Sequence, residues 1–305
     1  MRVLFIFLDG VGLGEDDPDI NPFAKIEMPF LQSLLGGQKL LAESAPFIGE
    51  RATLLPLDAT LDVDGLPQSA TGQAVLLTGL NVPKEIGEHY GPKPNAAVAK
   101  YLLNGNLFSQ VIKAGKTAAL LNAYPPRYFD GVNSGRRLYS AIPLAVTSAG
   151  LNLFNKEDYY AGRALSADFI GNGWRGVLGF PDAPIYEPRA AGQKMAALSN
   201  RYDFSFFEYW ASDYAGHKQD MNWAIEQFQI FDDVLVGLLD QWDDQDGLIL
   251  VTSDHGNMED LSTRRHTDAK VPLFLIGSLE ARAAFASGLT NLTGIYQCVL
   301  RVLSP

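Results

Sequence analysis

The chain has 305 residues, of which 47% are hydrophobic, and its formal net charge is −11. That length suits one large domain, or a core with a smaller insertion. The acidic balance argues against nucleic acid or an anionic membrane as a partner, because their phosphates favour clustered lysine and arginine. No apolar run reaches 18 residues, which argues against a membrane span. The single cysteine, Cys298, excludes an internal disulfide framework and is expected to be buried.

The first element is the apolar run "VLFIFL", which ends at Leu8. It is too short for the hydrophobic region of a signal peptide, and it leads directly into Asp9. We interpret it as the first strand of the fold and expect a cytoplasmic protein.

Strand and helix patterns then alternate along the chain. The predicted strands are residues 2–8, 202–210, 247–252 and 271–277. The predicted helices are residues 28–37, 69–80, 107–116 and 221–242. The first and third strands are apolar throughout, as expected for strands that are buried on both faces. The alternation predicts an α/β fold, with a mostly parallel sheet and helices on both of its faces.

The middle of the chain has a different character. From residue 124 to 197, glycine and proline are dense and the periodicity is weak. We expect this segment to be a small inserted cap or lid. Residues 1–123 and 198–305 would then form a discontinuous α/β core.

Acidic and histidine side chains stand at the ends of the predicted strands. In open α/β folds, ligands bind outside the carboxyl ends of the strands. The residues found there are Asp9, Asp213, His217, Asp254 and His255, and His266 precedes the last strand. Three of the four histidines in the chain therefore fall in these segments, and only His89 does not.

This set of residue types indicates a metal site. The donors are nitrogen and oxygen without thiolate, which suits Zn²⁺ or Mn²⁺. Six protein ligands are too many for one tetrahedral ion. They suit two ions, which lie about 3.5–4 Å apart when they cooperate in phosphoryl transfer.

Ser69 opens the predicted helix 69–80, and two interpretations of it stay open. A helix N-terminus favours anionic oxygens, so its hydroxyl could be a nucleophile that acts on a phosphate. The alternative is that Ser69 only caps the helix. The local sequence alone favours the cap.

Five short motifs resemble those of the alkaline phosphatase superfamily, most closely its cofactor-independent phosphoglycerate mutase and phosphopentomutase branch. They are "FLDGVG" (7–12, with Asp9), "SATGQ" (69–73), "SDYAGH" (212–217), "TSDHGNMED" (252–260) and "RHT" (265–267). Their order along the chain also agrees with that branch. The resemblance implies an alkaline-phosphatase-like fold and a metalloenzyme that binds two divalent metal ions.

The resemblance also implies a role for each matching position. One metal ion would be held by Asp213, His217 and His266. The other ion would be held by Asp9, Ser69, Asp254 and His255. Ser69 would be the catalytic nucleophile and would carry a phosphoserine intermediate, with Thr71 as the alternative.

Two departures from the mutases bear on the reaction. The mutases usually have histidine where this chain has Gln73, and the insertion here is short. A mutase must shield its phosphoenzyme from water while the substrate turns. We therefore expect an enzyme that acts on a small phosphate ester, and we favour a phosphatase over a phosphomutase. The alternatives are a phosphodiesterase or nucleotide pyrophosphatase, a sulfatase, and a non-catalytic metal-dependent binding module. "SATGQ" lacks the C/S-x-P-x-R pattern of a sulfatase.

Phosphate and carboxylate groups of a substrate favour arginine forks. The candidate substrate-binding residues are Arg136, Arg137, His89 and Arg265. The sequence carries no signal for the identity of the substrate or for the oligomeric state.

Overall fold

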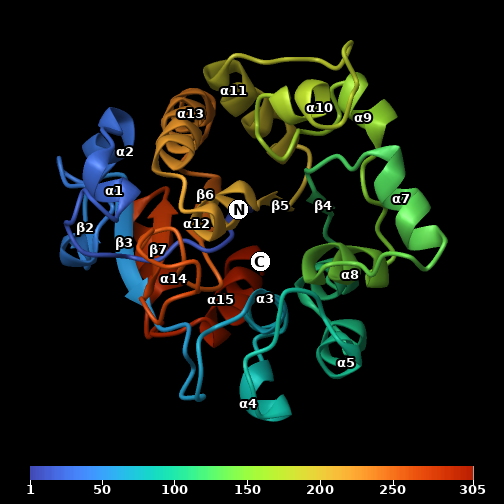
Figure 1. Ribbon diagram of the computed structural model, residues 1–305, viewed down its shortest axis with the longest axis horizontal. Helices are drawn as coiled ribbons and strands as arrows, with labels where there is room; N and C mark the ends of the chain where they lie inside the picture. The colour runs from blue at the N-terminus through green and yellow to red at the C-terminus, as the bar shows by residue number, and fades with distance from the viewer. Residues whose placement is uncertain (305) are drawn as a thin grey trace.

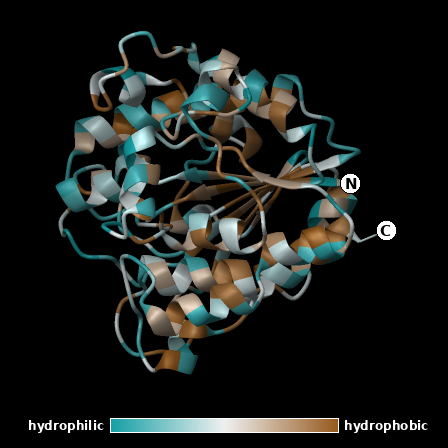
Figure 2. Ribbon diagram, turned by 90° about the vertical axis from the view of Figure 1, so that its right-hand side faces the viewer, coloured by the Kyte–Doolittle hydropathy of each residue, from teal (hydrophilic) through white to brown (hydrophobic). Residues whose placement is uncertain are grey.

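The computed structural model describes residues 1–304, and a seven-stranded sheet lies between two layers of helices in it (Figures 1 and 2). The strand order is β2-β3-β7-β6-β1-β5-β4. The strands are β1 (Arg2–Leu8), β2 (Phe47–Ile48), β3 (Ala52–Leu57), β4 (Ala118–Leu120), β5 (Phe204–Tyr209), β6 (Gly247–Thr252) and β7 (Val271–Ile276).

The first strand of the chain is the middle of the sheet. β1 pairs in parallel with β5 on one side and with β6 on the other, and β4 pairs in parallel with β5. β7 runs antiparallel to β6, and β3 runs antiparallel to β7, so β3 points the same way as β6. Five of the seven strands therefore share one direction, and the predicted α/β fold with a mostly parallel sheet is confirmed.

Side chains of each central strand point alternately into two apolar cores, one on each face of the sheet. On β1, Leu4 and Ile6 enter one core, while Val3 and Phe5 enter the other. Figure 2 shows these strands as a hydrophobic fan between the helices. The first core is covered by α1 (Pro22–Lys25), α2 (Pro29–Leu34), α11 (Pro188–Ser199), α12 (Ala211–Lys218) and α13 (Met221–Asp240).

The second core lies under the helices on the opposite face (Figure 1). They are α3 (Ser69–Thr78), α4 (Val82–Ile86), α5 (Ala96–Asn104), α6 (Leu107–Lys113), α7 (Pro126–Asn133), α8 (Ala141–Ser148), α14 (Leu279–Ala286) and α15 (Thr293–Leu303). Cys298 is buried in this core, as expected. No helix within residues 1–304 is both long enough and apolar enough to cross a membrane.

The segment 124–197 contributes to all three apolar clusters of the structure. α8 belongs to the second core and α11 to the first. Between them, α9 (Lys156–Tyr160) and α10 (Asn172–Gly176) enclose a small third cluster around the stacked rings of Tyr159 and Trp174. The cap proposed from the sequence therefore stays a proposal, and the residues around this third cluster are the part that best fits it.

Candidate metal centre

Six of the seven residues predicted as metal ligands stand at one edge of the sheet. They are Asp9 after β1, Asp213 and His217 on α12 after β5, Asp254 and His255 after β6, and His266 before β7. His266 shares this edge although it precedes its strand. Because β7 is antiparallel to β6, its first residue lies where β6 ends.

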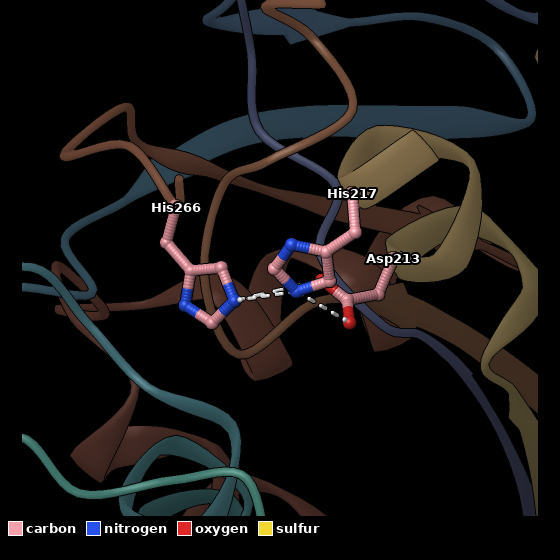
Figure 3. Close-up of side chains that lie close together, drawn as sticks. All are labelled: Asp213, His217 and His266. Carbon is pink, nitrogen blue, oxygen red and sulfur yellow. Dashed lines mark hydrogen bonds and ion pairs between the residues drawn. The ribbon is translucent and has the colours of Figure 1, made fainter. Parts of the chain in front are cut away.

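One group of donors is formed by α12 and the loop before β7 (Figure 3). Asp213 and His217 are four residues apart, so they share one face of the helix. The Nε2 atom of His217 lies 3.3 Å from Oδ2 of Asp213 and 3.3 Å from Nε2 of His266. Two nitrogens and a carboxylate therefore converge on one point.

A second group lies beside the first and includes Asp9, Asp213 and His255. Nε2 of His255 is 3.4 Å from Oδ1 of Asp9 and 3.6 Å from Oδ2 of Asp254. The rings of His255 and His266 stack with their centroids 3.8 Å apart. The two groups are therefore contiguous, and Asp213 faces both of them.

All three imidazoles are oriented by backbone carbonyls. The Nδ1 atoms of His217 and His266 lie 2.7 Å from the carbonyl oxygens of Arg264 and Pro67, and Nδ1 of His255 lies 3.3 Å from that of Gly256. A carbonyl only accepts, so each Nδ1 carries the hydrogen and each Nε2 presents a lone pair to the centre. This arrangement is typical of histidine ligands of metals.

The electrostatics of the centre favour a bound cation. Burial lowers the pKa of both His255 and His266 to about 4, so both rings are uncharged at neutral pH and their Nε2 atoms carry no hydrogen. Among the described residues, Oδ1 of Asp9 and Oδ1 of Asp213 are buried without a hydrogen-bond partner. Buried, unpaired carboxylates that face imidazole lone pairs are costly unless a positive ion lies between them. The residues therefore fit divalent metal ions.

The hydroxyl of Ser69 faces this centre. Ser69 is the first residue of α3, and the residue at the cap position is Gln68, so the interpretation of Ser69 as a cap does not hold. Its Oγ lies 3.0 Å from Nε2 of His255. Within residues 1–304, the amides of Ser69 and Ala70 have no hydrogen-bond partner, which leaves two donors beside the hydroxyl.

Two other polar side chains on α3, those of Thr71 and Gln73, form hydrogen bonds of their own. The Thr71 hydroxyl donates to the carbonyls of Gln68 and Tyr90, at 3.1 and 3.3 Å, and it is not among the converging donors. The amide of Gln73 donates to Oδ2 of Asp254 at 3.3 Å. Gln73 therefore helps to orient a predicted ligand at the position where the mutases usually have histidine.

Glu259 was not predicted to have a role, yet its buried carboxylate holds three segments of the centre together. Its Oε2 accepts hydrogen bonds from the amides of Gly12 and Asn257, both at 2.8 Å, and its Oε1 accepts one from the hydroxyl of Thr267. These partners lie within three residues of Asp9, His255 and His266, respectively. The only sequence signal was the position of Glu259 in the motif "TSDHGNMED".

Two glycines make room for the Glu259 carboxylate. A Cβ atom on Gly12 would lie 2.5 Å from Oε1 of Glu259, and one on Gly256 would collide with Oε1 and with Oγ1 of Thr267. Gly256 has no positive φ, so close approach rather than a turn explains the glycine.

Gly256→Ala is expected to destabilise the protein by about 2–3 kcal/mol, because a methyl group must displace the clamped carboxylate. Thermal unfolding in the presence of a chelator measures the effect. Gly176→Ala is the matched control, since a Cβ there meets open space. Equal stabilities of the two variants would contradict the steric argument.

Glu208 is a second carboxylate that the sequence analysis missed. It is the one charged residue of β5, its Oε2 accepts a 3.0 Å hydrogen bond from the hydroxyl of Tyr124, and burial raises its pKa to about 7. A single charge within the apolar strand "FSFFEY" was the available signal. Glu208 contributes further negative charge beside Asp9 and Asp254.

The predicted substrate-binding residues are dispersed. Arg136 contacts Ser134 on the surface, and the guanidinium of Arg137 lies 4.5 Å from the centre of the Tyr128 ring. Arg265 is exposed one residue before His266. His89 lies 3.1 Å from the carbonyl oxygen of Thr60 and lines a separate cavity. Substrate contacts by these four residues remain proposals.

Metal binding is expected to strengthen as the pH rises through about 7. Burial and repulsion by Asp213 raise the pKa of Asp254 to about 7, and the hydrogen bond to Asp213 raises the pKa of His217. Both groups must release their protons before they bind an ion. Calorimetric titration with Zn²⁺ or Mn²⁺ at pH 6 and pH 8, in buffers of different ionisation enthalpy, measures affinity and proton release.

The pKa of Asp254 also determines how the stability of the metal-free protein changes with pH. The folded-state pKa of Asp254 lies above its ordinary value. The protonated carboxyl therefore contributes to the stability of the metal-free protein at low pH, and this contribution is lost as the pH rises through about 7. A bound cation offsets that loss, and thermal stabilisation by metal should be larger at pH 8 than at pH 6.5. Asp254→Asn should reduce the difference, and an equal response at both pH values would contradict it.

Known proteins share the fold and part of the sequence of this chain. A family model described as the Metalloenzyme superfamily matches residues 188–303, which hold five of the seven predicted ligands. Two solved structures share the fold over almost the whole chain. The PH0037 protein from Pyrococcus horikoshii matches with a TM-score of 0.57 at 14% identity, over 99% of this chain and 96% of that one. The alkaline phosphatase from the Antarctic bacterium TAB5 matches with a TM-score of 0.52 at 13% identity, over 99% and 98%.

The fold is thus shared with an alkaline phosphatase, and the family-model match supports the resemblance to the alkaline phosphatase superfamily of metalloenzymes that the motifs predicted. The curated relatives that this chain matches are phosphoglycerate mutases, which agrees with the predicted resemblance to the phosphomutase branch. The 2,3-bisphosphoglycerate-independent phosphoglycerate mutase of Trypanosoma brucei brucei is 29% identical over 33% of this chain. The match spans only 23% of the length of that relative. Phosphoglycerate mutase activity therefore stays a proposal for this chain.

Proposed function

We propose that the protein is a two-metal phosphoryl-transfer enzyme that acts on a small phosphate ester through a phosphoserine at Ser69. The observation that carries this proposal is the position of the Ser69 hydroxyl, 3.0 Å from Nε2 of His255 at the first turn of α3. A nucleophile, a group of metal donors and free helix amides meet at one point there.

Two divalent ions are proposed, Zn²⁺ or Mn²⁺. Asp213, His217 and His266 would hold one ion, and Asp9, Asp254, His255 and the Ser69 oxygen would hold the other. Such ions lower the pKa of a coordinated hydroxyl and neutralise charge that develops on phosphoryl oxygens. The contact of Asp213 with both donor groups supports two adjacent ions over two distant ones.

The residues of the chain would then act as follows. The ionised Ser69 oxygen attacks phosphorus in line, an O–P bond forms, and the bond from phosphorus to the substrate oxygen breaks. The amides of Ser69 and Ala70 donate to the phosphoryl oxygens at the positive end of α3. The serine proton passes to solvent, and the departing alcohol takes a proton from solvent.

Hydrolysis is the favoured second half of the reaction. Water attacks the phosphoserine, releases inorganic phosphate and restores the serine hydroxyl. The small size of the segment around α9 and α10 supports this proposal, because a mutase must keep water from its phosphoenzyme. The phosphoglycerate mutases among the relatives favour the second candidate, in which a hydroxyl of the substrate accepts the phosphoryl group.

The test begins with protein that has been stripped of metal by a chelator. Addition of Mn²⁺ or Zn²⁺ should restore the turnover of a generic aryl phosphate, and phosphate release should match alcohol release. A phosphomutase would release little phosphate and would isomerise a sugar or glycerate phosphate instead. Absence of both reactions with either metal would refute an enzymatic function.

A further inference from the structure

A cavity of about 420 Å³ lies outside the metal centre, beside the start of α3. Its walls are two loops of the core, residues 64–68 and 88–91. The first loop leads directly into Ser69, and its Pro67 carbonyl oxygen lies 2.7 Å from Nδ1 of His266. The volume falls in the range of pockets that bind small molecules.

The second loop is fixed against the first turn of α3. The amide of Thr71 donates to the carbonyl of Tyr90 at 3.0 Å, and the amide of Tyr90 donates to the hydroxyl of Thr71 at 3.1 Å. A Cβ atom on Gly91 would lie only 3.4 Å from the amide nitrogen of Ser69. The cavity wall therefore touches the backbone of the proposed nucleophile.

The polar groups of the cavity favour a ligand with ammonium or hydroxyl groups over one with a negative charge. The lining includes the carboxylates of Asp64 and Glu88, the amide of Gln68 and the imidazole of His89, and the described lining holds no lysine or arginine. Burial lowers the pKa of His89, so the ring is neutral at pH 7. A carboxylate or second phosphate placed here would meet two negative charges without a counter-charge. An ammonium or hydroxyl group would find acceptors.

We infer that this cavity receives the alcohol portion of the phosphate ester, and that this alcohol bears an ammonium group or several hydroxyls rather than a second anion. The inference rests on the proposed function, because it places the phosphoryl group at Ser69. It gives the enzyme a substrate preference opposite to that of a phosphoglycerate enzyme, whose substrate carries a carboxylate.

The test measures kcat/KM for three esters, O-phosphoethanolamine, glycerol 1-phosphate and 3-phosphoglycerate, with an aryl phosphate as reference. The first two should each exceed 3-phosphoglycerate by about tenfold, since the exposed charges of Asp64 and Glu88 each contribute a few-fold. In the double variant Asp64→Asn/Glu88→Gln, the ratio of the phosphoethanolamine value to the 3-phosphoglycerate value should fall by about tenfold. Glu85→Gln, an exposed carboxylate on the nearby α4, is the control and should keep the wild-type ratio.

The outcomes separate this inference from the proposed function. Turnover of the aryl phosphate with a preference for 3-phosphoglycerate, or with an unchanged ratio in the double variant, would overturn the inference alone. Loss of turnover of every ester in metal-loaded wild-type protein would refute the proposed function and this inference with it. Thermal unfolding of the double variant establishes that a changed ratio does not come from loss of fold.

Discussion

Ser69→Ala is expected to reduce the turnover of an aryl phosphate by at least about 10³-fold, as removal of a nucleophile does in enzymes with covalent intermediates. The variant should keep the wild-type fold, because the only hydrogen bond of the Ser69 hydroxyl within residues 1–304 is the one to Nε2 of His255. The direct measurement is mass spectrometry of protein quenched during turnover. A phosphoryl group adds about 80 Da to the peptide that carries Ser69 in the wild type, and it should be absent from the variant.

Thr71→Ala is the matched control, two residues along the same helix. The Thr71 hydroxyl is occupied by the backbone of Gln68 and Tyr90, so its loss should leave the adduct on Ser69. An adduct on Thr71, or turnover by Ser69→Ala near the wild-type rate, would contradict the proposed mechanism. Metal binding provides a further distinction, since a folded Ser69→Ala protein should still bind ions through its carboxylates and imidazoles.

Glu259→Ala is expected to destabilise the protein by about 3–5 kcal/mol and to weaken metal binding by about 10–100-fold. The variant leaves the amides of Gly12 and Asn257 buried without an acceptor, and it frees the Thr267 hydroxyl. Each loop that Glu259 holds also carries a proposed metal ligand. Thermal unfolding with a chelator and calorimetric metal titration measure the two effects separately.

Glu259→Gln distinguishes the geometry of this contact from its charge. The glutamine oxygen can still accept from both amides, and its NH₂ group can donate to the Thr267 hydroxyl. This variant should therefore recover most of the stability and of the metal affinity. Glu280→Ala, an exposed carboxylate on α14, should match the wild type. Wild-type metal affinity in Glu259→Ala would refute the positioning role.

The elements that could be predicted are those whose burial pattern is local. Residues 3–8 and 248–251 are uniformly apolar because helices cover both faces of β1 and β6. β3 was missed since its "ATLLPL" includes proline and threonine, and β4 has only three residues. The antiparallel direction of β7 could not be predicted, because periodicity reports which face is buried and not the direction of a strand.

The candidate metal centre also has some features that could be predicted from the sequence and others that could not. Asp254 and His255 were found because strand ends in an α/β fold converge, a rule that needs only the order of elements. Glu259 was missed because its partners are backbone amides, which have no sequence signature. The stacked position of His255 over His266, and the free amides beside Ser69, depend on loop geometry that no local pattern specifies.

The central place of β1 has a consequence for how the chain is made. Val3 pairs with Phe204 and with Leu248, so β1 is synthesised about two hundred residues before either of its partners. Until those partners emerge, a wholly apolar strand has two open edges, which is a known route to aggregation. Contacts of such long sequence separation also slow folding. The nascent N-terminal half should therefore depend on protection that the finished protein no longer needs.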